Sequence, residues 1–337
     1  MFIQRAAALG AAAALSGCAA SIAAPTTRKP FRVGWLNAGI ARSDAGGRLR
    51  DALQEIGYVE GRDFVIELAY ADNVPDRLPT LASELVRLKV DVIVAGGEDA
   101  LSAARNATSS TPIVFRGVRD PLGEGILSSL ARPGGNVTGV TSFLEIGSKG
   151  FELFKALVPG LTRVAKLYNP ALTGNVSLIR AEEKIARELD IQLIPVPVSV
   201  IDELLPRLES AARDRPQALA TALGVSFFGR GPTDPAFIEK FGLFLDLMVR
   251  EKLPHCFGEV DAVRAGALLS SGANNAQGWR LVAYQIDKIV KGANPGELPV
   301  VAVNVFDVAL NLGMARKIGL TIPESVLRQA TELIDIP

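Results

Sequence analysis

The chain has 337 residues, of which 48% are hydrophobic and 21% charged, a composition typical of a globular protein and not of a disordered or collagen-like one. At roughly 150 residues per domain, this length favours two domains. Lys plus Arg and Asp plus Glu balance at 36 each, so the basic excess that nucleic-acid binders need is missing, and we expect no nucleic-acid partner. The single histidine, His255, argues against a multi-histidine metal site, and we expect neither metal nor cofactor.

The first thirty residues have the features of an export signal. Arg5 gives a positive start, and the uncharged run 6–15 is too short to span a bilayer as a permanent helix. Leu15-Ser16-Gly17-Cys18 follows and looks like a bacterial lipobox, which makes Cys18 the predicted lipidation site. A plain secretory signal with an incidental cysteine is the alternative. With no second long apolar stretch, we expect a periplasmic or cell-surface protein attached to the membrane only through a lipid at Cys18.

From Phe31 to Val140, short apolar runs alternate with amphipathic segments. The continuous run from Val90 to Ala95 fits a strand buried on both faces of a parallel sheet. Strand, helix, strand in this rhythm predicts right-handed crossovers and a doubly wound sheet. Strands are expected at 31–36, 64–68, 90–95, 112–115 and 137–140, and helices around 49–56, 78–88, 99–107 and 122–130.

The same rhythm restarts near Phe151, which predicts a second Rossmann-like lobe and an α/β protein with a cleft between two lobes. After this second unit, a helix at 277–291, a strand at 300–305 and a helix at 308–318 exceed what one lobe needs, so some should cross back to the first lobe. We therefore predict a signal peptide and tether at 1–30, a first lobe of 31–141 plus about 268–296, and a second lobe of 142–267 plus about 297–337.

Several motifs then resemble those of ABC transporter substrate-binding proteins, the family typified by tryptophan- and tyrosine-binding lipoproteins. The most specific is Arg132-Pro133-Gly134-Gly135-Asn136-Val137-Thr138-Gly139, and further matches extend from about Phe31 to Pro323. The resemblance implies a type I periplasmic binding protein fold, in which two hinged lobes close on a small molecule. It also implies an ABC permease and an ATPase as partners. We expect the binding protein itself to be a monomer.

Ligand sites in open α/β sheets lie beyond the carboxyl ends of the strands, which selects the residues that follow each apolar run. Small residues there let backbone N–H groups approach an anion, and the helix that starts near Asp99 adds its dipole. Phe227 and Phe228 are expected either to wall an aromatic ligand or to belong to the core. The predicted ligand-binding residues are Asn37, Ala38, Gly39, Gly97, Glu98, Asp99, Arg116, Gly117, Arg119, Thr141, Ser142, Asn169, Ser226, Phe227 and Glu259.

Two arginines and two acids stand where the family usually has small residues. One hypothesis is that Arg116 or Arg119 binds a ligand carboxylate with its two-pronged guanidinium while Glu98 takes an amino or hydroxyl group. The alternative is an internal ion pair between Glu98 and Arg116 that shapes the pocket. Because these residues change the polarity of the cleft, the expected ligand is an amino acid, an aromatic acid or another carboxylate.

The residues do not favour an enzyme. The sequence has no phosphate-binding loop, no G-x-S-x-G elbow and no H-E-x-x-H helix. His255 and Cys256 are neighbours in a predicted strand and should point to opposite faces, so they cannot act as base and nucleophile. We predict binding followed by lobe closure, with hinges near 138–142 and 267–272. The alternatives are a ligand-sensing lipoprotein for a membrane receptor and, as a weaker option, a secreted α/β hydrolase.

Overall fold

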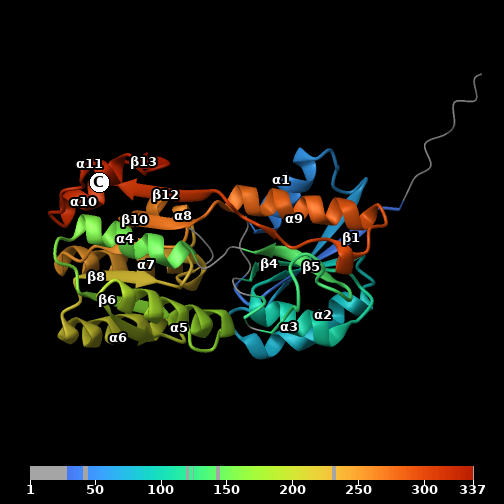
Figure 1. Ribbon diagram of the computed structural model, residues 1–337, viewed down its shortest axis with the longest axis horizontal. Coiled ribbons are helices and arrows are strands. Elements are labelled where there is room, and N and C mark those ends of the chain that lie inside the picture. Colours follow the sequence, from blue (N-terminus) through green and yellow to red (C-terminus); the bar gives the residue numbers. More distant parts are fainter. Residues whose placement is uncertain are drawn as a thin grey trace, which may run out of the picture.

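The computed structural model describes residues 29–40, 45–118, 121–123, 125–141, 145–229 and 233–336. These form two lobes that lie side by side, each a sheet with helices on both faces (Figure 1). The predicted α/β class with two doubly wound lobes is therefore confirmed. The predicted lipidation site Cys18 and the predicted ligand residues Arg119 and Ser142 lie outside the described residues and stay predictions.

The first lobe is built on six strands that all run parallel, in the order β11-β5-β4-β3-β1-β2. In the middle of this sheet, Val92 to Ala95 are fully buried, which explains the continuous apolar run in the sequence. The bounds are β1 Phe31–Asn37, β2 Phe64–Tyr70, β3 Val92–Gly96, β4 Ile113–Val118, β5 Val137–Thr141 and β11 Val301–Ala302.

Two pairs of helices cover the first sheet: α2 packs beside α3, and α1 packs beside α9. Side chains alternate between the two faces, so Leu36 and Ile93 join the α2–α3 cluster while Trp35 and Val94 join the α1–α9 cluster. The bounds are α1 Ala45–Glu55, α2 Leu78–Arg87, α3 Glu98–Ala107 and α9 Asn275–Val290.

The second lobe is built on seven strands in the order β13-β12-β10-β9-β8-β6-β7. They run parallel except at one edge, where β12 pairs antiparallel with β10 and carries β13 parallel to itself. The bounds are β6 Arg163–Tyr168, β7 Gln192–Pro197, β8 Ala218–Thr221, β9 His255–Phe257, β10 Leu269–Ala273, β12 Phe306–Asn311 and β13 Glu332–Ile334.

The helices of the second lobe also form two groups, one on each face of its sheet. Phe154 of α4 and Met314 of α10 pack in one apolar cluster with Cys256, whereas Leu204 of α6 and Phe244 of α7 pack in the other. The bounds are α4 Glu145–Leu157, α5 Thr173–Glu188, α6 Leu204–Ala211, α7 Pro235–Arg250, α8 Val260–Arg264, α10 Leu312–Lys317 and α11 Glu324–Leu327.

The C-terminal part of the chain returns to the first lobe and leaves it again. Helix α9 packs on the first sheet and β11 pairs with β5, after which β12 rejoins the second sheet. The crossings therefore lie between β10 and α9 and between β11 and β12. This differs from the predicted lobe boundaries, because residues 269–273 pair in the second sheet and residues 301–302 in the first. The assignment of whole domains remains a prediction.

One helix prediction was wrong, and another placed the start of its helix too early. Among the described residues of 122–130 there are only turns and bends, since glycines interrupt the segment and Gly125 has a φ of 66°. The predicted helix at 308–318 begins too early: β12 extends to Asn311, whose side chain then caps α10 by accepting a hydrogen bond of 3.1 Å from the backbone of Met314.

No helix in the described part of the chain is long and apolar enough to cross a membrane. The same residues contain no cluster of His, Cys, Asp and Glu that could hold a metal ion.

Candidate ligand-binding site

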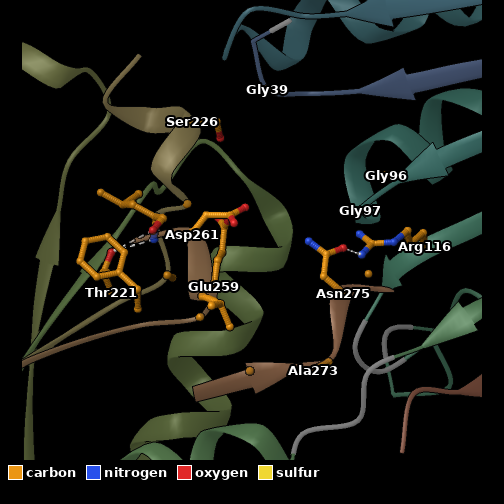
Figure 2. Close-up of a pocket in the computed structure, with 18 of the residues that line it drawn as sticks. Gly39, Gly96, Gly97, Arg116, Thr221, Ser226, Glu259, Asp261, Ala273 and Asn275 are labelled. Carbon is orange, nitrogen blue, oxygen red and sulfur yellow. Dashed lines mark hydrogen bonds between the residues drawn. The ribbon is translucent and has the colours of Figure 1, made fainter. Parts of the chain in front are cut away.

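A cavity of about 990 Å³ lies between the two lobes, where the carboxyl ends of both sets of parallel strands face each other. This is the position predicted from the strand-end rule. Figure 2 shows its two walls, with Gly39, Gly97 and Arg116 from the first lobe opposite Ser226 and Glu259 from the second.

In the first lobe the cavity floor is made by the ends of β1 and β3. Asn37 closes β1 with a tight turn, since its side-chain oxygen accepts a hydrogen bond of 2.8 Å from Gly39, and its amide donates to the carbonyl of Gly96 over 3.3 Å. A Cβ at Gly96 would overlap Asn37 and the ring of Trp35. Gly96 therefore allows the side chains of Asn37 and Trp35 to pack against the end of β3.

Arg116, at the end of β4, is the cation of the first-lobe wall. Its guanidinium lies 4.3 Å from the centre of the Trp279 ring and donates to the side-chain oxygen of Asn275, both on α9. Its Nε is buried without a hydrogen-bond partner, and it forms no ion pair with any described carboxylate. Burial lowers the pKa of Arg116 to about 10, with Arg48 adding to the decrease and Glu259 opposing it. The group still stays charged at neutral pH.

The second-lobe wall carries an acid and an aromatic ring. Glu259 accepts a hydrogen bond of 3.2 Å from the backbone of Val225, and its negative charge acts on Arg116 across the cavity. Phe227 lines the cavity, whereas Phe228 lies in the core, 4.9 Å from Phe241 between ring centres. Phe228 therefore belongs to the core, whereas Phe227 lies on the cavity wall, and its contact with an aromatic ligand stays a prediction.

Glu98 and Asp99 reach across to the other lobe. Asp99 accepts hydrogen bonds from the backbone (3.1 Å) and the hydroxyl (2.5 Å) of Thr173, at the start of α5. Glu98 is buried against Gly174, where a Cβ would overlap its carboxylate. The alternative of an internal ion pair between Glu98 and Arg116 is therefore not the arrangement that the structure has.

A second contact joins the lobes through Arg48 of α1, which forms an ion pair with Asp261 of α8. Both side chains line the cavity and are partly shielded from solvent, with 30% and 22% of their area exposed. Together with the bonds to Thr173, this pair brings the lobes into direct contact around the cavity.

Most of the described residues that were predicted to bind ligand line the cavity. Thr141 does not: it is buried in β5 and donates a hydrogen bond of 2.7 Å to the carbonyl of Val118. The predicted residues that line it are Asn37, Ala38, Gly39, Gly97, Glu98, Asp99, Arg116, Gly117, Asn169, Ser226, Phe227 and Glu259.

Sequence reasoning missed Arg48, Asp261, Asn275 and Trp279. The first two lie on helices and meet only because the lobes dock, which no periodicity reveals. Asn275 lies two residues after the end of β10, so the strand-end rule would have selected it if residues 267–272 had not been interpreted only as a hinge.

Comparison with known proteins supports the interpretation of the fold as that of a two-lobed binding protein. The family model described as ABC transporter substrate binding protein matches residues 39–334. A tyrosine-binding protein from Clostridioides difficile (strain R20291) is 26% identical over 261 residues, which is 77% of this chain and 72% of that protein.

Two solved structures resemble the whole described fold. A conserved domain protein from Vibrio cholerae has a TM-score of 0.78 and 25% identity. An ABC domain from Streptococcus pneumonia, in complex with L-Trp, has a TM-score of 0.77 and 22% identity. Each comparison covers 90% of this chain and 100% of the other. Since the family model matches most of its length, the chain belongs to the ABC transporter substrate-binding proteins, a family that binds small molecules for ABC transporters.

Proposed function

We propose that the protein captures a small organic carboxylate between its lobes, outside the cytoplasmic membrane, and delivers it to an ABC permease with its ATPase, without chemical turnover. A lipid at Cys18 holds the monomer at the membrane in this proposal. The observation that carries the ligand class is Arg116, a half-buried guanidinium that faces the cavity with no carboxylate partner among the described residues.

A cation placed in this way favours an anionic ligand. Arginine has five side-chain N–H donors, and among the described residues the guanidinium of Arg116 donates only to the neutral amide of Asn275. The guanidinium carbon lies 4.3 Å from the centre of the Trp279 ring, a contact that helps to hold the side chain, and we propose that N–H donors not used by Asn275 bind the ligand carboxylate. Tyrosine and tryptophan, the ligands named for two of the similar proteins, both carry a carboxylate and an aromatic ring.

The proposal is tested by calorimetric titration of a panel of carboxylates, each paired with its primary amide. Binding of the carboxylates should weaken roughly 10- to 100-fold in Arg116→Gln, the loss expected for a hydrogen bond to a charged group, and the amides should change much less. Arg105→Gln is the matched control, because Arg105 on α3 is exposed and bonds to the carbonyl of Ile126. Unchanged carboxylate affinity in Arg116→Gln would exclude this role.

Glu259 gives a second, independent test of the ligand class. Its carboxylate lies on the wall opposite Arg116, and we propose that it accepts a hydrogen bond from a ligand ammonium group. Glu259→Gln should lower the affinity for amino acids by about tenfold. The affinity for their deaminated counterparts should change by no more than about twofold. If no amino acid in the panel binds the wild type better than its deaminated counterpart, the ammonium role of Glu259 is wrong.

A further inference from the structure

Part of the cavity lining belongs to the second lobe and is not used by the carboxylate site, and we call this part the arm. It runs between α5 and the face of the second sheet, and its lining includes Lys166, Glu182, Ala220 and Cys256. Lys166 pairs in register with Ala220, and Ala220 with Cys256, so the three side chains project from the same face of the sheet. The arm is therefore bounded by the face of the sheet whose Ala220 and Cys256 also belong to the apolar cluster with α4 and α10.

A buried ion pair closes this arm. Nζ of Lys166 lies 2.8 Å from both carboxylate oxygens of Glu182, and only Oε1 accepts a hydrogen bond in this geometry. The side chains are 6% and 7% exposed. Taking two charges out of water is costly, and a pair of apolar residues would fill the same space without this cost.

Both members of the pair have hydrogen-bonding capacity left over. Lys166 has three N–H donors and makes its one hydrogen bond to Glu182 among the described residues. Oε2 of Glu182 is buried, and among the described residues its one polar contact is the ionic contact of 2.8 Å with Nζ of Lys166, so it has acceptor capacity left. An ammonium donor and a carboxylate acceptor thus stand next to each other on a cavity wall.

Apolar side chains and a neutral thiol also line the arm. Phe151, Phe154 and Leu178 line it from α4 and α5. Burial raises the pKa of the Cys256 thiol to about 12, so it carries no charge at neutral pH. The ion pair is neutral as a whole, so the attraction of one member for a ligand charge is opposed by the repulsion of the other, and the pair does not favour a charged group.

We infer that this arm is a subsite for a hydroxyl group, in which the ligand oxygen accepts a hydrogen bond from Lys166 and donates one to Glu182. A single hydroxyl uses both groups at once, and the apolar walls suit an aromatic ring that carries it. The preferred ligand is then a hydroxylated aromatic carboxylate, with its acid at Arg116 and its phenol in the arm. This inference rests on the proposed function for its carboxylate end.

Calorimetric titration with matched pairs tests the subsite. The pairs are benzoate and 4-hydroxybenzoate, 3-phenylpropionate and 3-(4-hydroxyphenyl)propionate, and L-phenylalanine and L-tyrosine. In at least one pair the hydroxylated member should bind the wild type tenfold or more tightly, because a site built for a hydroxyl leaves its buried groups unpaired when the hydroxyl is missing. The ratio should fall to about threefold or less in the double variant Lys166→Met/Glu182→Leu, which removes both charges together.

Two further variants keep the test decisive. Lys155→Met on α4 removes an exposed lysine that bonds to the carbonyl of Leu189, and it should keep the full hydroxyl preference. Glu182→Gln leaves Lys166 without its counter-charge, so the arm should then favour a carboxylate. The affinity of terephthalate, which has a second carboxylate, should rise about tenfold relative to that of 4-hydroxybenzoate. The measurement on Glu182→Gln tests the subsite even if the double variant does not fold.

The outcomes separate the subsite from the proposed function. If carboxylates bind through Arg116 but no pair shows the preference, or the preference survives in the double variant, the subsite is wrong and the proposed function stands. If no member of the panel binds the wild type, both fall.

Discussion

At the scale of single residues, His255 shows how burial decides what a titratable group can do. Its Nδ1 donates to the carbonyl of Leu253 over 3.1 Å, and its Nε2 accepts from the backbone of Leu268 over 2.9 Å. These contacts fix the neutral form, since a proton on Nε2 would face another N–H group. Burial lowers the pKa of His255 to about 4, against a small opposing effect of the bond to Leu253.

This depressed pKa predicts a pH dependence of stability. Below the unfolded pKa of about 6.5 the unfolded chain takes up a proton that folded His255 refuses, so the free energy of unfolding should fall as the pH drops from 7 toward 4. From pH 7 to pH 5 the loss amounts to about 2 kcal/mol. In urea unfolding measured at several pH values, His255→Leu should lack this part of the dependence of the unfolding free energy on pH. The chain has no other histidine that could replace it. Equal slopes in both proteins would show that His255 titrates normally.

The strand-end rule selected residues whose position follows from the order of strands within one lobe. Arg116 and Gly97 lie at strand ends of the first sheet, and the order of apolar runs predicts that position. Their partners were not predictable in the same way. Whether Arg116 meets Glu98 or Asn275 depends on how α9 returns to the first lobe, and a single sequence gives no distance between segments 159 residues apart.

At the scale of elements, the motif that carries the family resemblance is structural. A Cβ at Gly139 would overlap the ring of Phe115 in the neighbouring strand, so only glycine fits there. Asn136 donates to the carbonyls of Thr108 and Thr111 and thereby fixes the loop before β4. The motif therefore indicates the fold strongly and the ligand not at all, which is why the sequence predicts architecture better than specificity.

Helix α5 is capped from the other lobe. Its own N-cap position is Leu172, which has no side-chain oxygen, and Asp99 of the first lobe accepts the hydrogen bonds from Thr173 instead. The cap exists only while the lobes touch, so it adds to the stability of the closed state and to ligand affinity. Asp99→Ala should weaken carboxylate binding by about 2- to 30-fold, the range expected for loss of a cap.

Asp234 provides the matched control for this prediction. It caps α7 within the second lobe by accepting a hydrogen bond of 3.1 Å from Ala236. Asp234→Ala should lower the melting temperature and leave the affinity within about twofold, because its cap is present in both open and closed states. Thr173→Val should weaken binding less than Asp99→Ala does. In the double variant, the loss of binding free energy should be smaller than the sum of the two single losses. Additive losses would mean that Asp99 acts on the ligand directly.

At the scale of the whole molecule, the lobes are connected by segments that are themselves hydrogen-bonded to one another. Asn274 donates to both carboxylate oxygens of Asp307 over 3.0 Å, and its backbone donates to Val305. Gln277 accepts from the backbone of Asn304 and of Val305. Two of the connections therefore lie side by side, and a rotation of one lobe has to bend both together, as a hinge does.

The contacts between the lobes predict how closure responds to variants and salt. A ligand shifts the population toward the closed form only by its preference for that form, and contacts between the lobes, such as Arg48 to Asp261, add to the same equilibrium. In small-angle scattering, the radius of gyration should fall when the tightest carboxylate of the panel saturates the wild type. Arg48→Ala/Asp99→Ala should start from a larger radius without ligand and reach the same radius at saturation. Raising the salt from 0.05 to about 0.5 M should weaken binding to the wild type more than to this variant, since screening acts on a partly exposed ion pair. A radius that is unchanged by saturating ligand in the wild type would contradict hinge closure.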